Sequence, residues 1–130
     1  MGFAAFRDQK YLSLETFKKS GEGVRTPVWF AADPTGDLGG NEARLFIYTI
    51  GNTGKVKRIR NNPGVRIAPC KIKGEPLGEY MDALAEIITG EEAARAMKLL
   101  NKKYFPWKQL LGFFALFSRR ERIVMVIRPA

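Results

Sequence analysis

The sequence predicts a mainly β protein, an antiparallel barrel of six or seven strands with few helices. Three observations support this. Short stretches are either wholly apolar or alternate between apolar and polar residues, and turns rich in glycine, proline and charged residues separate most of them. Helical spacing is sustained in one late segment only. With 130 residues and no internal repeat, the chain is expected to form one domain over residues 1–130.

Three strands are predicted in the first half of the chain. Phe3–Lys10 is predicted as a short leading helix, and Tyr11–Phe17 alternates as a half-buried strand does. After a glycine-containing turn, Val24–Ala32 is the second strand. Its Pro27 has no N–H to donate, which predicts a strand edge, a bulge, or a ligand in place of a partner strand. A loop rich in turn residues then leads to the third strand, Ala43–Thr49.

The second half is predicted to complete the sheet and to contain the one longer helix. Val65–Ile72 and Tyr80–Ile88 are strand-like, and Ile123–Ile127 forms a last apolar strand. Between them, apolar residues recur at helical spacing from Glu91 to Lys103, with acidic residues in the first turn and basic residues in the last, as the helix dipole favours.

A basic turn between the third and fourth strands is the most informative segment. Small polar residues and glycine precede it, so that a side chain such as Thr53 caps a helix whose free N–H groups favour an anion. Gly54 permits close approach, and Lys55 and Arg58 project side by side at a spacing of three residues. This pattern is typical of a phosphate site. The alternative interpretation is a basic, solvated helix face.

The composition limits the kinds of chemistry that are available. A formal net charge of +9 favours anionic partners, which include phosphorylated cofactors, acidic substrates, nucleic acid and anionic membrane surfaces. The absence of histidine excludes histidine-based triads and most zinc sites, so an enzyme of this composition is expected to rely on a bound cofactor, without a metal site. Cys70, the single cysteine, is interpreted as a buried structural thiol.

Residues 107–117 are aromatic and apolar. Leu110–Phe117 is too short to span a bilayer, and the N-terminus lacks a signal-peptide pattern, so a cytoplasmic location is expected. Three interpretations of Trp107–Phe117 remain open, in order of preference: packing on the barrel, a subunit interface, and contact with lipid.

Several segments, in their order and spacing, resemble the split-barrel flavin-binding family that includes pyridoxamine 5′-phosphate oxidase. The resemblance is closest to its branch of small oxidoreductases that use the deazaflavin coenzyme F420. The segments are Thr16–Gly21, Thr26–Phe30, Tyr48–Thr49, Gly54–Pro63, Val65 and Ala68–Cys70. The resemblance implies an FMN-binding-like split barrel that forms a homodimer, with the cofactor in a groove between the protomers.

The resemblance also implies the residues of the cofactor site. Thr53, Gly54, Lys55 and Arg58 would hold the phosphate, and Arg25 stands where the oxidase branch has a phosphate-binding arginine. The ring system would be contacted along one edge by Thr26, Pro27, Val28 and Trp29, along the other by Ala68, Pro69 and Cys70, and its approach would be lined by Tyr48 and Thr49.

Departures from the family pattern guide the choice of cofactor and function. Phe30 replaces a lysine of the oxidase branch, and that branch's C-terminal histidine and arginine are missing, which disfavours vitamin B6 oxidation. The segment Thr26–Trp29 is similar to the F420 branch, whose coenzyme carries an acidic glutamate tail suited to a basic protein. FMN is the alternative cofactor.

The expected function is hydride transfer between the cofactor and a small electron-poor substrate. No catalytic side chain is assigned, and Tyr48 is a weak candidate for a proton donor. One alternative is a cofactor-binding protein of the same fold without turnover. A second, a nucleic-acid binder, is disfavoured because no nucleic-acid-binding motif is recognisable.

Overall fold

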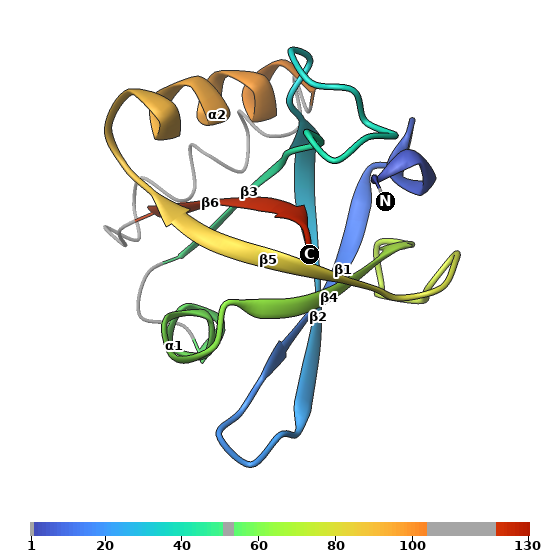
Figure 1. The fold of residues 1–130 in the computed structure, drawn as a ribbon, viewed down its shortest axis with the longest axis vertical. Helices are drawn as coiled ribbons and strands as arrows, with labels where there is room; N and C mark the ends of the chain where they lie inside the picture. Colours follow the sequence, from blue (N-terminus) through green and yellow to red (C-terminus); the bar gives the residue numbers. More distant parts are fainter. Residues whose placement is uncertain (1, 51–53, 104–121) are drawn as a thin grey trace.

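The computed structural model describes residues 2–50, 54–103 and 122–130. Within these residues, six antiparallel strands close into a barrel in the order β1-β2-β3-β6-β5-β4 (Figure 1). The strands are β1 (Tyr11–Phe17), β2 (Gly23–Ala32), β3 (Leu45–Ile50), β4 (Gly64–Cys70), β5 (Met81–Ile88) and β6 (Arg122–Pro129). The helices are a 3₁₀ turn (Ala4–Phe6), α1 (Gly54–Asn61) and α2 (Gly90–Lys103). The predicted mainly β barrel is therefore confirmed.

The barrel has a seam between β2 and β3. β2 is ten residues long, but its register with β3 contains only the pairs Phe30–Ile47, Ala31–Phe46 and Ala32–Leu45. Toward its N-terminal end β2 stays paired with β1, whereas β3 continues along β6. Figure 1 shows β3 turning away from the long β2 ribbon in the direction of α1. The two strands therefore separate just beyond Phe30 and Ile47.

The core fills the barrel and includes residues from outside the strands. Val56 and Ile59, on one face of α1, are buried in the same cluster as the inward side chains of the sheet, as are Phe3 and Phe6. Strand residues of this cluster include Leu12, Leu14, Phe30, Leu45, Ile47, Val65, Ile67, Ala85, Met125 and Ile127. Burial of Val56 and Ile59 fixes the orientation of α1, because a helix with one apolar face has one favourable way to dock.

The predicted leading helix over Phe3–Lys10 is wrong beyond a single turn. Phe3 and Phe6 are almost fully buried and their rings meet edge to face at 5.8 Å between centroids. Arg7 then leaves the helical conformation and Asp8 adopts a φ of 61°, which ends the turn. Anchoring of the two phenylalanines in the core leaves the chain only a few residues in which to enter β1.

β1 is more buried than the predicted half-buried strand. Leu12 and Leu14 face the core, while Ser13 and Glu15 on the outer face are also buried. The side-chain oxygens of Ser13 and Tyr80 are hydrogen-bonded at 2.7 Å, and Arg25 Nε donates to Glu15 Oε2 at 2.9 Å. The predicted alternation of β1 is confirmed, but Tyr80 and Arg25 cover its polar face.

α2 packs on the outside of the barrel. Its Ala96 and Leu100 are fully buried, and in Figure 1 the helix lies along the upper edge of the sheet. Ala96 packs in one cluster with residues of β3, β5 and β6, while Leu100 packs against Ala31 of β2. The end of β2 is also tied to α2 by an ion pair in which Arg95 donates to both carboxylate oxygens of Asp33, at 2.5 and 3.1 Å.

The Asp33–Arg95 pair predicts a pH dependence of stability. Hydrogen bonding from Arg95, opposed in part by burial and reinforced by Thr35, lowers the pKa of Asp33 from 3.8 to about 2. A lowered carboxyl pKa stabilises the fold above the unfolded-state value, and this contribution is lost as the pH falls through the folded-state value. We expect about 1 kcal/mol, because the Arg95 side chain is 43% exposed and water screens the pair.

Asp33→Asn should therefore lose about this much stability at neutral pH and should show a flatter stability profile than the wild type between about pH 4 and 2. Urea unfolding at a series of pH values measures both. Parallel profiles for wild type and variant across this window would contradict the assignment.

Candidate functional site

A pocket lies where β2 and β3 separate. It has a volume of about 220 Å³ and is lined by Pro27, Val28, Trp29, Tyr48, Thr49 and Lys55. The first three residues are on the part of β2 that has left β3, the next two are on β3, and Lys55 is in the first turn of α1. Every one of these residues was predicted to contact the cofactor, and the seam brings them together. Pro27 lies on β2 outside the β2–β3 pairing, in agreement with an edge position.

The basic residues of α1 are divided between the barrel and the surface. Lys55 and Arg58 are half-buried, whereas Lys57 and Arg60 are exposed. Arg58 turns back along the helix, and its Nε donates to Oγ1 of Thr16 on β1 at 2.6 Å. Its guanidinium lies over Gly54, where a β-carbon would be 2.5 Å from Nη1. Two of the three cations predicted to contact phosphate, Lys55 and Arg58, are therefore near the start of α1.

The charged form of Lys55 is disfavoured by its surroundings. Burial, followed by the positive charge of Arg58, lowers the pKa of Lys55 below the usual lysine value. Among the described residues, no carboxylate forms an ion pair with Lys55 or Arg58. Two like charges held together without a counter-ion are more stable when an anion lies between them. The first turn of α1 therefore has the charge distribution of an anion site.

The structure places Arg25 outside this pocket. Arg25 lies opposite Glu15 in the β1–β2 register, its Nε donates to the Glu15 carboxylate, and its guanidinium lies 4.1 Å from the centre of the Tyr80 ring. The Glu15 side chain is only 10% exposed, so Arg25 neutralises a carboxylate that is largely removed from water. Its predicted phosphate contact stays a prediction.

The other predicted residues occupy three further positions. Ala68, Pro69 and Cys70 are buried on β4, which pairs with the opposite edge of β1 from β2, so they do not line the pocket. Burial raises the pKa of the Cys70 thiol, in agreement with a structural role. Thr26 precedes Pro27 on β2, and its buried Oγ1 has no hydrogen-bond partner among the described residues. Thr53 and the segment Trp107–Phe117 lie outside the described residues.

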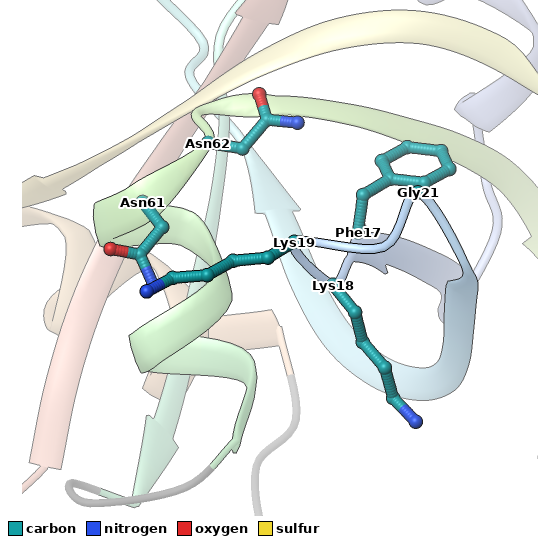
Figure 2. Close-up of a pocket in the computed structure, with 6 residues that line it drawn as sticks. All are labelled: Phe17, Lys18, Lys19, Gly21, Asn61 and Asn62. Atoms are coloured by element: carbon teal, nitrogen blue, oxygen red, sulfur yellow. The ribbon is translucent and has the colours of Figure 1, made fainter.

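A second pocket lies at the other end of α1. It has a volume of about 520 Å³, and Figure 2 shows its lining: Phe17, Lys18, Lys19 and Gly21 from the β1–β2 hairpin, with Asn61 and Asn62 from the end of α1. Lys19 extends from the hairpin toward Asn61, while Lys18 points away and pairs with Glu22 at 3.3 Å. Lys18 and Lys19 belong to a segment that carries the family resemblance.

Comparisons with known proteins establish the fold. No protein-family model matches the chain, and no curated protein matches it in sequence. Among solved structures, HutZ, the heme storage protein of Vibrio cholerae, is 15% identical over 100% of this chain and 92% of its own, with a TM-score of 0.69. A Listeria innocua protein provisionally assigned as a pyridoxamine 5′-phosphate oxidase is 15% identical over 97% and 88%, with a TM-score of 0.62.

An F420 reductase is 20% identical over 98% of this chain and 91% of its own, with a TM-score of 0.59. The protein therefore has the split-barrel fold that these structures share, which confirms the fold implied by the resemblance. Because proteins of this fold bind different groups, the likeness does not choose among cofactors.

The described residues contain no group of three or more potential metal ligands, and none of their helices has the length and apolar character needed to cross a membrane.

Two partners of the predicted site residues were not foreseen. The pairing of Glu15 with Arg25 could have been predicted, because the short turn between the two strands sets these residues opposite each other. The contact of Thr16 with Arg58 could not, because it joins residues 42 positions apart. The partner of Arg58 depends on how α1 docks on the barrel, which no local pattern encodes.

Arg25 can be tested as a structural residue. Arg25→Ala strands the nearly buried Glu15 carboxylate and should reduce the free energy of unfolding by about 1–2 kcal/mol. Adding Glu15→Gln should recover part of this loss, because it removes the unpaired charge. Urea unfolding of the wild type, both single variants and the double variant measures the coupling, and purely additive losses would contradict the structural pairing.

Proposed function

We propose that the protein is a homodimeric oxidoreductase that holds coenzyme F420 at the β2–β3 seam and transfers a hydride between it and a small electron-poor substrate. The observation that carries the proposal is the pocket itself. It combines two aromatic side chains, Trp29 and Tyr48, with the partly buried ammonium of Lys55. A flavin-type cofactor has the complementary groups: an aromatic ring system that can stack on aromatic side chains and, joined to it through a ribityl chain, a phosphate that can pair with an ammonium group.

The residues fit such a group at both of its ends. Lys55, Arg58 and the free N–H groups at the start of α1 supply positive charge for the phosphate. Pro27 leaves the β2 edge without an N–H at that position, so a ring could lie beside the strand without stranding a donor there. Val28 and Trp29 would cover the ring and exclude water from it.

A second protomer would complete the site. The pocket volume of about 220 Å³ is below the roughly 300–1,000 Å³ usual for ligand sites of this kind. We take the described residues to provide only part of a cofactor site. The structural neighbours include an F420 reductase and an FAD-binding protein. We propose that the remaining wall comes from another copy of this chain.

The second pocket favours F420 over FMN. Lys55 is in the first turn of α1 and Asn61 is its last residue, so the two pockets lie at opposite ends of one eight-residue helix. At 1.5 Å per residue the distance along the axis is about 9 Å, which a short chain could span. An acidic glutamate tail that leaves the phosphate could reach Lys19 and the amides of Asn61 and Asn62. FMN has no such tail.

The cofactor, when bound, would supply the hydride chemistry. The chain would bind the phosphate, orient the ring against Trp29 and Tyr48, and shield it from water, so that positioning supplies much of the rate enhancement. Tyr48 lines the pocket and stays the candidate proton donor from this protein. A cofactor-binding protein without turnover is the alternative within the same site.

Cofactor titration tests the proposal. The protein should bind F420 with micromolar or better affinity and FMN more weakly, and Lys55→Gln should weaken F420 binding about tenfold or more. Arg60→Ala removes one exposed charge from the same helix and should change the affinity less than twofold. Fluorescence titration with F420, FMN and hemin measures each affinity. Binding of hemin alone, or equal effects of the two variants, would contradict the site.

A matched pair of ligands tests the tail. Lys19→Ala should lower the affinity for F420 several-fold but leave the affinity for a tail-free phosphorylated deazaflavin unchanged. The reason is that Lys19 lines the pocket at the C-terminal end of α1, whereas Lys55 is at the N-terminal end. Lys18→Ala is the control, since Lys18 points away from the pocket and pairs with Glu22. Equal affinities of the Lys19→Ala variant and the wild type for F420 would remove the reason to prefer F420 over FMN.

A further inference from the structure

We infer that Thr16 and Gly54 are positioning residues that fix the guanidinium of Arg58 over the first turn of α1, ready for a phosphate group. The inference rests on the proposed function in that the phosphate would be the one carried by the cofactor. It goes further by assigning to Thr16 and Gly54 a role in placing Arg58, which is distinct from contact with the anion itself. Two independent observations support it, one for each residue.

Thr16 fixes one edge of the guanidinium. Its side chain is fully buried on β1, and its Oγ1 accepts the Nε–H of Arg58 at 2.6 Å. The short distance is that of a charge-assisted hydrogen bond. An arginine fork is planar, so fixing Nε also fixes the direction in which the two Nη groups point. Thr16 pairs with Val24 on β2, and its neighbour Glu15 is paired on both edges, with Arg25 on β2 and Arg66 on β4, so the backbone at Thr16 is a firm support.

Gly54 makes room for the other edge. Its φ is not in the left-handed region, so the backbone at this position does not require glycine. A β-carbon there would lie 2.5 Å from Nη1, 3.3 Å from Cζ and 3.5 Å from Nη2 of Arg58, and these three atoms are its nearest neighbours. The guanidinium of Arg58 therefore occupies the place that a side chain at this position would take. Glycine is otherwise a poor residue in a helix.

The two contacts together hold Arg58 close to Lys55 before any ligand arrives. The charge of Arg58 is one of the two causes of the lowered Lys55 pKa, so the cations are near enough to repel each other. A free arginine side chain would swing away from such a neighbour. Because Thr16 and Gly54 retain it, the loss of side-chain entropy of Arg58 and its repulsion from Lys55 are overcome during folding rather than on binding. The phosphate then meets a preorganised pair of cations.

The experiment compares variants that move Arg58 without changing any charge. Thr16→Val removes the acceptor with little change in shape, and Thr16→Ser keeps the hydroxyl. Gly54→Ala pushes the guanidinium aside, and it should fold well because only the end of a flexible side chain must move and alanine favours helix. For each variant, titration gives the affinity for three ligands: inorganic phosphate, F420, and the deazaflavin part of F420 without the phosphate. Urea unfolding confirms that each variant is folded.

Thr16→Val and Gly54→Ala should each lower the affinity for phosphate and for F420 about tenfold. The affinity for the phosphate-free deazaflavin should change by less than about twofold. Thr16→Ser should bind like the wild type. A general structural defect would weaken all three ligands. Unchanged affinities for phosphate and F420 in both variants, or equal losses for the phosphate-free ligand, would overturn the inference.

The outcomes separate this inference from the proposed function. If the wild type binds inorganic phosphate, and Thr16→Val and Gly54→Ala weaken it, but no deazaflavin or flavin binds, then the positioning role stands and the cofactor assignment fails. If F420 binds and its affinity is the same in all variants, the cofactor assignment stands and the positioning role fails. A wild type that binds neither phosphate nor any of the cofactors overturns both.

Discussion

The shortness of the β2–β3 register is the constraint on which the site depends. If these strands were paired along their whole length, no gap would remain between them, and Pro27, Trp29 and Tyr48 would lie on a continuous sheet. Instead each strand keeps its other partner, β1 for β2 and β6 for β3, so the sheet stays closed while the seam opens. The hydrogen bonds given up at the seam are few, and the space gained is a pocket whose walls are rigid strands.

Much of this architecture could be predicted from local sequence. β1 and α2 follow the alternating and helical patterns closely, and α1 is helical in the basic segment after the third strand, as predicted. The failures have a common cause. The leading helix is reduced to one turn because Phe3 and Phe6 are held by the core, and the polar face of β1 is buried because Tyr80 and Arg25 cover it. Each depends on contacts with other segments of the chain, which the periodicity of the segment itself does not report.

The candidate site shows the same division. The residues that line the seam pocket were predicted from the resemblance, and the structure brings them together from β2, β3 and α1. Partners of charged side chains were harder to predict. Arg25 and Glu15 form a cross-strand pair that the hairpin register implies, whereas Arg58 meets Thr16 only because α1 docks through Val56 and Ile59. A basic residue in a motif therefore indicates where charge lies along the chain, and tertiary packing decides what it contacts.

The basic run of α1 illustrates why the two interpretations of its sequence, a phosphate site and a solvated helix face, do not compete. Docking of Val56 and Ile59 sets the rotation of the helix, and the rotation divides the four cations. Lys55 and Arg58 are half-buried, and burial and the charge of Arg58 disfavour the charged form of Lys55, while Lys57 and Arg60 remain exposed to water. Only the first pair gains substantially from a nearby anion, because exposed charges are already well solvated and screened. The pocket lies on the side of the helix where positive charge is costly, and this cost is what an anionic ligand would relieve.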